Sequence, residues 1–287
     1  MKSYSTKKLI ILNIILLIPL IMYGIYKNGI LIYSKNLINL ISIFKPLYLI
    51  LIGLLIKVIV DLIKYKKIQY DYNFIYVILI GMMMPYNINY LVYIILFLFI
   101  YIFCMFLNRY IKFNKVCFIY LGIILVNFLI NDFTFLSPLE QNYSFSYEFI
   151  DLLVGRNVGG LCTTSIFFTL ISYIILINNY YYKKDIPLSI NLTYLALIGI
   201  YSIISSNTNY LLNSELIFAS IFVSTLPEYS PYKVNNQIIY GIVIGVISFI
   251  LTITFNSVIS IYIATFVMSL TENINIKHNT TKRTIDK

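Results

Sequence analysis

The sequence predicts an all-α integral membrane protein, with about ten transmembrane helices arranged as two five-helix halves. Hydrophobic residues make up 60% of the chain and charged residues only 11%, with a mean hydropathy of +0.86, whereas soluble domains are roughly half apolar and a quarter charged. The apolar residues also come in blocks of roughly 12 to 20. Inside a bilayer, the backbone N–H and C=O groups of such blocks need partners within the segment, and a helix provides them.

The first half is predicted from five blocks. Residues 9–26 follow Lys7 and Lys8 and are predicted to be a retained span, because the block is too long for a signal peptide and lacks its small-residue cleavage site. Several blocks are shorter than the roughly 20 residues that an upright span needs, and residues 30–44 fit an interfacial helix, so nine or eleven spans are the alternatives to ten. The other four predicted spans are residues 46–63, 72–85, 90–107 and 116–130.

The second half follows a polar interval and again contains five blocks. We therefore divide the chain into a first half (1–130), an extracytoplasmic loop (131–160), a second half (161–272) and a cytoplasmic tail (273–287). An odd number of spans in each half would invert one repeat relative to the other and place a site at their junction. The blocks of the second half are residues 161–177, 187–205, 210–226, 238–255 and 258–270.

The distribution of lysine and arginine supports the orientation. With ten spans and both termini in the cytoplasm of a plasma-membrane protein, most of these cations fall in cytoplasmic segments, as the positive-inside rule requires. Only Lys27, Lys35, Lys45 and Arg156 fall outside. The basic residues are scattered through short loops rather than gathered on one polar face, which argues against nucleic-acid binding and favours anchoring in a lipid bilayer.

Cysteine and histidine usage excludes further classes. The chain has three cysteines and one histidine, too few for a disulfide scaffold or a Cys/His zinc site, so no metal site is predicted.

Two motifs carry a resemblance to a known family. Residues 155–165 read G-R-N-V-G-G-L-C-T-T-S, similar to a family segment G-N-I-P-G-S-I-G-E-T-S. Residues 224–231 read S-T-L-P-E-Y-S-P, similar to A-T-D-P-V-T-S-P. The chain thereby resembles the family that contains the D subunit of Rnf electron-transport complexes and the B subunit of sodium-pumping NADH:quinone oxidoreductases. The positions in register include Gly155, Gly159, Thr164, Ser165 and Thr225.

The resemblance implies a cofactor and partners. The family carries flavin mononucleotide (FMN) as a phosphoester on a threonine in a segment like D-G-Y-S-G-A-T-P-L. Residues 131–139 read N-D-F-T-F-L-S-P-L, so Thr134 matches the family serine and Ser137 falls on the attachment position. A flavin transferase and further membrane subunits are then expected partners. The alternative for Ser137 is a turn serine before Pro138. Gly155 to Ser165 fits a helix cap and also a ligand loop, and the two are compatible because free N–H groups at a helix start suit a phosphate.

Three ionisable residues in predicted spans are candidates for an ion path, because burying charge in a membrane is costly. Lys57 and Asp61 are four residues apart and are expected to pair on one helix face. Glu215 is predicted about one turn inside the outer end of its span, where it either meets an ion path or reaches the interface.

The sequence leaves three functions open. The first is a membrane subunit of a flavin-dependent, ion-translocating electron-transport complex, which is not a complete enzyme alone because the chain has no iron–sulfur ligand set. The second is a small-solute transporter or channel of five-plus-five topology. The third is a redox-inactive membrane scaffold derived from the family.

Overall fold

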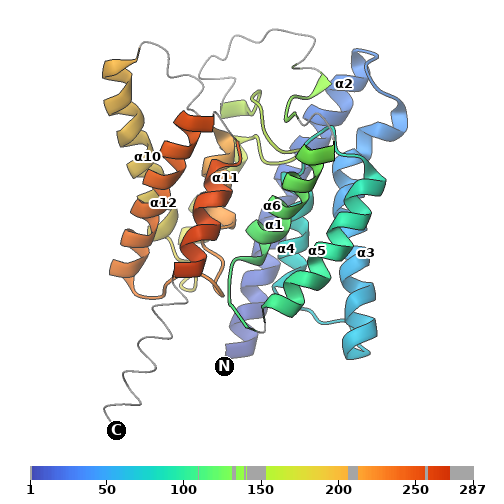
Figure 1. Cartoon of the computed structure of the whole chain (residues 1–287), viewed down its shortest axis with the longest axis horizontal. Coiled ribbons are helices and arrows are strands. Elements are labelled where there is room, and N and C mark those ends of the chain that lie inside the picture. Colours follow the sequence, from blue (N-terminus) through green and yellow to red (C-terminus); the bar gives the residue numbers. More distant parts are fainter. Residues whose placement is uncertain are drawn as a thin grey trace.

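The structure is a computed structural model that describes residues 2–108, 110–130, 134–138, 140, 153–205, 213–255 and 258–271. Most of the predicted loop and all of the predicted tail lie outside this part. The described residues form helices joined by loops, without a strand (Figure 1). The helices of the first half are α1 (Lys2–Ile25), the π-helix η1 (Tyr26–Ile30), α2 (Leu31–Ser34), the 3-10 helix η2 (Leu40–Phe44), α3 (Lys45–Tyr65), α4 (Asn73–Met83), α5 (Tyr90–Leu107) and α6 (Lys115–Ile130). They are followed by α9 (Ile166–Ile177), α10 (Asp185–Ile204), α11 (Ser214–Phe222), α12 (Val234–Phe255) and an unlabelled helix, Ser260–Thr271.

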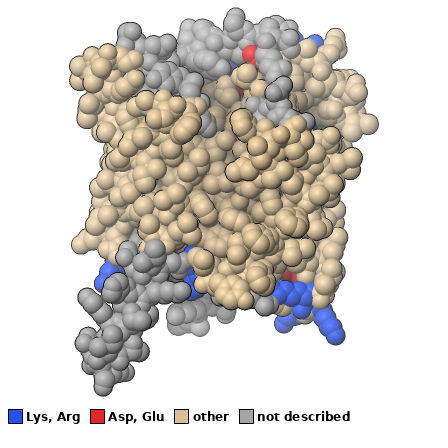
Figure 2. All heavy atoms as spheres, viewed as in Figure 1, with Lys and Arg blue, Asp and Glu red and all other residues tan. Residues whose placement is uncertain are grey.

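Five helical segments are long and apolar enough to cross a membrane. They are Lys8–Ser34, Leu40–Tyr65, Tyr90–Leu107, Asp185–Ile204 and Val234–Phe255. Many large aliphatic side chains on them are exposed, and Figure 2 shows an almost uncharged band between two ends that carry the basic and acidic atoms. The chain is therefore a multi-pass membrane protein whose exposed apolar surface faces lipid.

Every predicted apolar block contains a helix, but several helices are shorter than their block. The third block ends in α4 at Met83, because Met84 is extended (ψ 145°) before Pro85, as residues before proline usually are. The block at 161–177 becomes helical only at Ile166, and the block at 210–226 yields the nine-residue α11. Residues 30–44, for which an interfacial helix was one expectation, contain α2 and η2.

Small residues bring α10 and α12 into close contact. An added Cβ at Gly241 would lie 1.8 Å from Oγ of Ser189, and one at Gly245 would lie 2.0 Å from Oγ1 of Thr193. Such a small-xxx-small pair lets two membrane helices approach closely where no hydrophobic effect drives them together. This packing joins the two long helices of the second half.

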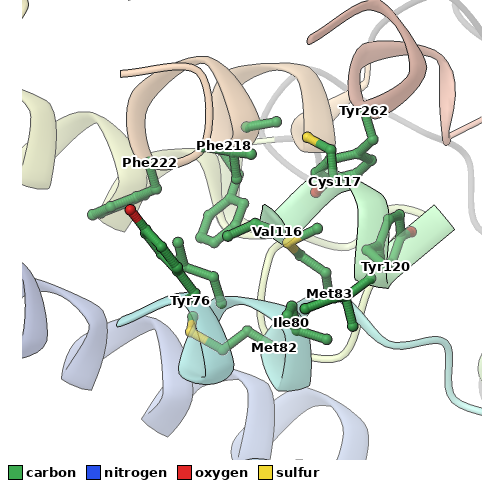
Figure 3. Packing of buried hydrophobic residues seen from close by; sticks show 14 of the residues in the cluster. Tyr76, Ile80, Met82, Met83, Val116, Cys117, Tyr120, Phe218, Phe222 and Tyr262 are labelled. Atoms are coloured by element: carbon green, nitrogen blue, oxygen red, sulfur yellow. The ribbon is translucent and has the colours of Figure 1, made fainter. Parts of the chain in front are cut away.

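The centre of the molecule is built from helices of both halves. Figure 3 shows side chains from α4, α6, α11 and Ser260–Thr271 meeting in one apolar cluster. The Tyr120 and Tyr262 ring centroids are 4.6 Å apart, and the Cys117 and Thr265 side chains are 3.0 Å apart. The two short helices α4 and α11 thus end inside a shared core, next to the segment with the glycine-rich motif. The labelled members of the cluster are Tyr76, Ile80, Met82, Met83, Val116, Cys117, Tyr120, Phe218, Phe222 and Tyr262.

Candidate functional site

The glycine-rich segment 155–165, here called the glycine loop, closes tightly on itself before α9. Gly155 has a φ of +104°, and an added Cβ would lie 2.8 Å from the Cα of Ser165, so a glycine is required there. Ser165 is the N-cap of α9, and its Oγ accepts a hydrogen bond from the Phe168 N–H at 3.5 Å. The capping role expected for this end of the loop is therefore present.

The loop pairs with the unwound end of α4. The Leu161 N–H donates to the carbonyl of Met84 at 2.9 Å, and the Cys162 N–H donates to the carbonyl of Met82 at 3.0 Å. An added Cβ at Gly160 would lie 2.7 Å from the carbonyl oxygen of Met83. These contacts satisfy backbone groups that the end of a helix leaves without intrahelical partners, and they join the two halves of the chain.

Glu215 anchors the loop from the other side. Its side chain is 0% exposed. Oε1 accepts a hydrogen bond from the Gly160 N–H at 2.6 Å and another from the Thr163 hydroxyl, and Oε2 accepts one from the Tyr262 hydroxyl. The carboxylate lies in the first turn of α11, where the helix dipole favours negative charge. Of the two places expected from the sequence, an ion path or the membrane interface, the interface is wrong, because the Glu215 side chain is fully buried.

A second buried charge, Lys27, holds the loop from η1. Its Nζ lies 2.9 Å from Oε1 of Glu140 and donates to the carbonyl of Asn157 at 2.6 Å. The neighbouring Asn28 donates through Nδ2 to the carbonyl of Leu161 at 2.7 Å. Lys27, which we assigned to the outer side from the sequence, is therefore a buried residue of η1. Sequence reasoning missed Lys27, Asn28, Glu140 and Asn157 as site residues.

Ser137 reaches this network through a capping turn. Its N–H donates to Oε2 of Glu140 at 2.9 Å, and its Oγ accepts from the Glu140 N–H at 3.4 Å. These reciprocal bonds form a capping box with proline at the first helical position, so Ser137 lies in a capping turn. Thr134 accepts a hydrogen bond from Nδ2 of Asn87 at 2.7 Å.

The folded turn does not fit an FMN phosphoester. The Ser137 side chain is only 2% exposed, its oxygen caps the turn, and the Glu140 carboxylate would lie next to the negative charge of the phosphodiester that links FMN to a serine. The glycine loop does not offer ready space either, because its backbone is in close contact with Met83, Ser165 and Glu215. In the loop, Thr164 is buried, and its Oγ1 has no hydrogen-bond partner among the described residues.

The remaining predicted site residues lie elsewhere. Thr225 follows the C-terminal end of α11, where its hydroxyl donates to the Ile221 carbonyl at 2.6 Å. The glycine loop is bonded to Glu215 at the N-terminal end of the same helix. The two family motifs therefore lie at opposite ends of α11. The second motif is held by Lys183, whose Nζ donates to the Ser230 carbonyl at 2.5 Å.

Lys57 and Asp61 form the predicted pair on α3. The Nζ–Oδ2 distance is 2.6 Å and both side chains are buried. Lys57 also donates to the Gln69 carbonyl and lies 3.4 Å from Oδ1 of Asp71. The cluster closes the α3–α4 connection, far along α3 from the glycine loop. Its geometry is that of a structural pair.

The part of the chain that the structure describes contains no group of three or more His, Cys, Asp or Glu side chains that could hold a metal ion. Cys104, Cys117 and Cys162 are buried free thiols.

Comparison with known proteins identifies the family. None of the curated proteins matches the chain. The model of the NQR2, RnfD, RnfE family matches residues 103–285, more than half of the chain, including the glycine loop, Glu215 and the second motif. The chain therefore belongs to the NQR2, RnfD, RnfE family.

Proposed function

We propose that this chain is a D-type membrane subunit of an ion-translocating electron-transport complex in the plasma membrane. Family membership supports the class of complex. The single observation that carries the proposal is the glycine loop, which is bonded on one side to the broken end of α4 and on the other to Glu215 of α11. Short helices that end at a shared loop are how membrane transport proteins build sites between repeats.

The proposed architecture is two inverted five-helix halves with both termini in the cytoplasm. Support comes from the position of the short helices, since α4 corresponds to the third predicted block of the first half and α11 to the third of the second. The long connection that includes Ser137 and Glu140 then lies on the outer side, where Lys27 ties it to the glycine loop. The charge distribution along the sequence supports the same orientation.

Glu215 is the residue we propose for the ion path. It is a carboxylate whose hydrogen-bond donors are all uncharged groups, namely a backbone N–H and two hydroxyls. Such an intramembrane carboxylate is costly to bury and is a functional candidate by default. Lys57 and Asp61, which neutralise each other, are assigned a structural role.

Other subunits are required for electron transfer. The chain has only three cysteines, all buried as free thiols, and a four-cysteine cluster cannot form from them. We propose that the partners supply the iron–sulfur and nicotinamide chemistry, while this subunit supplies membrane helices and the buried carboxylate.

A flavin-dependent subunit is the second candidate, in which a flavin transferase attaches FMN to Ser137. What supports it is the match of residues 131–139 to the family segment and the link from Ser137 through Glu140 to Lys27, a buried cation. A bound FMN would supply one-electron and two-electron transfer. The closed turn opposes it, so the mass measurement described in the Discussion decides between a flavin-carrying and a flavin-free subunit.

The experiment for the main proposal is purification from native membranes. A tag on the chromosomal copy, followed by extraction in mild detergent, should recover the chain with several other membrane subunits and with iron–sulfur absorbance. The Glu215→Gln variant should keep this assembly but lose ion-dependent electron transport, whereas Glu228→Gln should keep both. A chain that purifies alone and moves a small solute in proteoliposomes would instead establish the transporter alternative. A chain that purifies alone and moves no solute would favour the redox-inactive membrane scaffold.

A further inference from the structure

We propose that the C-terminal ends of α3 and α5 bind the phosphate headgroup of an anionic phospholipid. The site, here called the basic edge, consists of Lys64 in the last turn of α3, Lys66 and Lys67 directly after α3, and Lys112 after α5. All four side chains are exposed. The inference is independent of the electron-transport function.

The positive charge of the basic edge is not neutralised within the described part of the chain. The acids nearest in sequence, Asp61 and Asp71, are both engaged by the buried Lys57, at 2.6 and 3.4 Å. Further along, Glu228 pairs with Lys115 at 3.6 Å. The four lysines make no ion pair with described residues, so they leave a net attraction for an external anion.

The lysines lie at the level of the headgroups. Lys64 is in the last turn of α3, and Lys66 caps its C-terminal end in a left-handed conformation with a φ of 53°. The segment Leu40–Tyr65 is a candidate membrane span, so these ammonium groups follow directly on residues that face acyl chains. α5 packs against α3, and both helices run to the same end of the molecule (Figure 1). Lys112 follows α5 in the sequence and is exposed.

The backbone that carries the lysines is held in place. Lys57 donates to the Gln69 carbonyl, and the Gln69 N–H donates to Asp61 at 3.2 Å. Tyr70 stacks on Phe74 with 5.5 Å between ring centroids. A buried ion pair thus fixes the turn that displays Lys66 and Lys67, which lowers the ordering cost of binding.

The surroundings favour a lipid over an acidic protein. Ile63 is 79% exposed and Tyr70 77% exposed, next to the lysines, and Tyr110 and Ile111 are exposed beside Lys112. Apolar side chains that continue the lipid-facing band contact acyl chains, and aromatic rings favour the membrane interface. Lysines without an ion-pair partner attract the phosphate groups of anionic lipids. In Figure 2 basic atoms gather at one end of the uncharged band.

The test uses the purified full-length chain and defined lipids. Native mass spectrometry after exchange into detergent should show retained phosphatidylglycerol in preference to phosphatidylcholine. Lys64→Gln combined with Lys66→Gln should weaken phosphatidylglycerol binding by roughly 30-fold, because each lysine near an anionic surface contributes roughly fivefold. The matched control combines Lys184→Gln and Lys233→Gln, two exposed lysines that precede α10 and α12, and should keep the wild-type preference.

Three outcomes would overturn the proposal. No preference for phosphatidylglycerol would exclude a site, and equal loss in the control variant would reduce the effect to overall charge. Full displacement by millimolar inorganic phosphate would point to a soluble anion instead of a lipid. An unchanged melting temperature of both double variants in phosphatidylcholine nanodiscs verifies that folding is intact.

Discussion

The Gly160 N–H donates to the buried carboxylate of Glu215 at 2.6 Å, across 55 residues of sequence. This bond ties the glycine loop to the first turn of α11, and the same oxygen accepts the Thr163 hydroxyl. The buried Glu215 side chain therefore joins the glycine loop to α11. Removing this side chain should weaken the position of both elements.

Glu215→Ala should destabilise the protein by about 3 kcal/mol, because the Gly160 N–H and two hydroxyls lose their acceptor in a buried site. Glu215→Gln should cost less, since an amide oxygen still accepts from Gly160 and Thr163 and the Tyr262 hydroxyl can accept from the amide. Thermal unfolding in detergent measures both. Glu228→Ala, which removes a 43% exposed side chain whose ion pair with Lys115 spans 3.6 Å, should change stability by at most about 1 kcal/mol. Equal losses at the two positions would contradict the anchoring role.

The helices were predictable from the sequence, whereas the loop network was not. Apolar blocks identify helices because hydropathy is a local property, and Lys57 and Asp61 pair because they are four residues apart on one helix. Lys27 and Glu140 come together only through the tertiary fold, and no local pattern marks them. The early ends of α4 and α11 likewise depend on partners elsewhere in the chain.

Gly245→Ala should destabilise the packing of α10 and α12 by about 1 to 3 kcal/mol, because the new Cβ would lie 2.0 Å from Oγ1 of Thr193 and 3.0 Å from the Ile190 carbonyl, and overpacking forces side chains and backbone to shift. The control is Gly199→Ala, since nothing lies within 4 Å of an added Cβ there and alanine favours helix. A drop in melting temperature for Gly245→Ala and none for Gly199→Ala is expected. The reverse order would rule out close packing at Gly245. Residues 241–245 read G-I-V-I-G, a G-x-x-x-G pattern typical of closely packed membrane helices, which we did not use to predict this contact.

Lys27 and Glu140 should be energetically coupled. Lys27→Met leaves the Glu140 carboxylate buried without its cation and should cost about 3 to 5 kcal/mol, whereas the Lys27→Met, Glu140→Gln double variant should recover part of that loss. The amide oxygen introduced by Glu140→Gln can still accept the Ser137 N–H, so the capping turn persists. A double-mutant cycle by thermal unfolding measures the coupling. Strict additivity of the two changes would mean that the 2.9 Å contact contributes nothing.

The proposed orientation predicts opposite labelling of two introduced cysteines. Lys67, after α3, and Leu37, after α2, are both exposed, and α2 lies at the other end of the molecule from the N-terminal start of α1 (Figure 1). In a cysteine-free background, a membrane-impermeant maleimide should label Leu37→Cys in intact cells and Lys67→Cys only after lysis. The three native cysteines are buried, so the wild-type chain should label weakly in both cases. Reversed labelling would place the glycine loop near the cytoplasm.

The mass of peptide 131–140 tests the flavin question directly. When the chain is co-expressed with the flavin transferase of its own cell, the closed capping turn predicts an unmodified peptide, because the Ser137 oxygen is buried and bonded to the Glu140 N–H. The family resemblance predicts the opposite, a gain equal to flavin mononucleotide less one water. Ser137→Ala must abolish such a gain and Thr134→Ala must leave it, since only the attachment hydroxyl is required. Modification in wild type and Thr134→Ala would establish a flavin-dependent subunit and show that the turn opens for the transferase. Bare peptide throughout would place the electron carriers in the partner subunits.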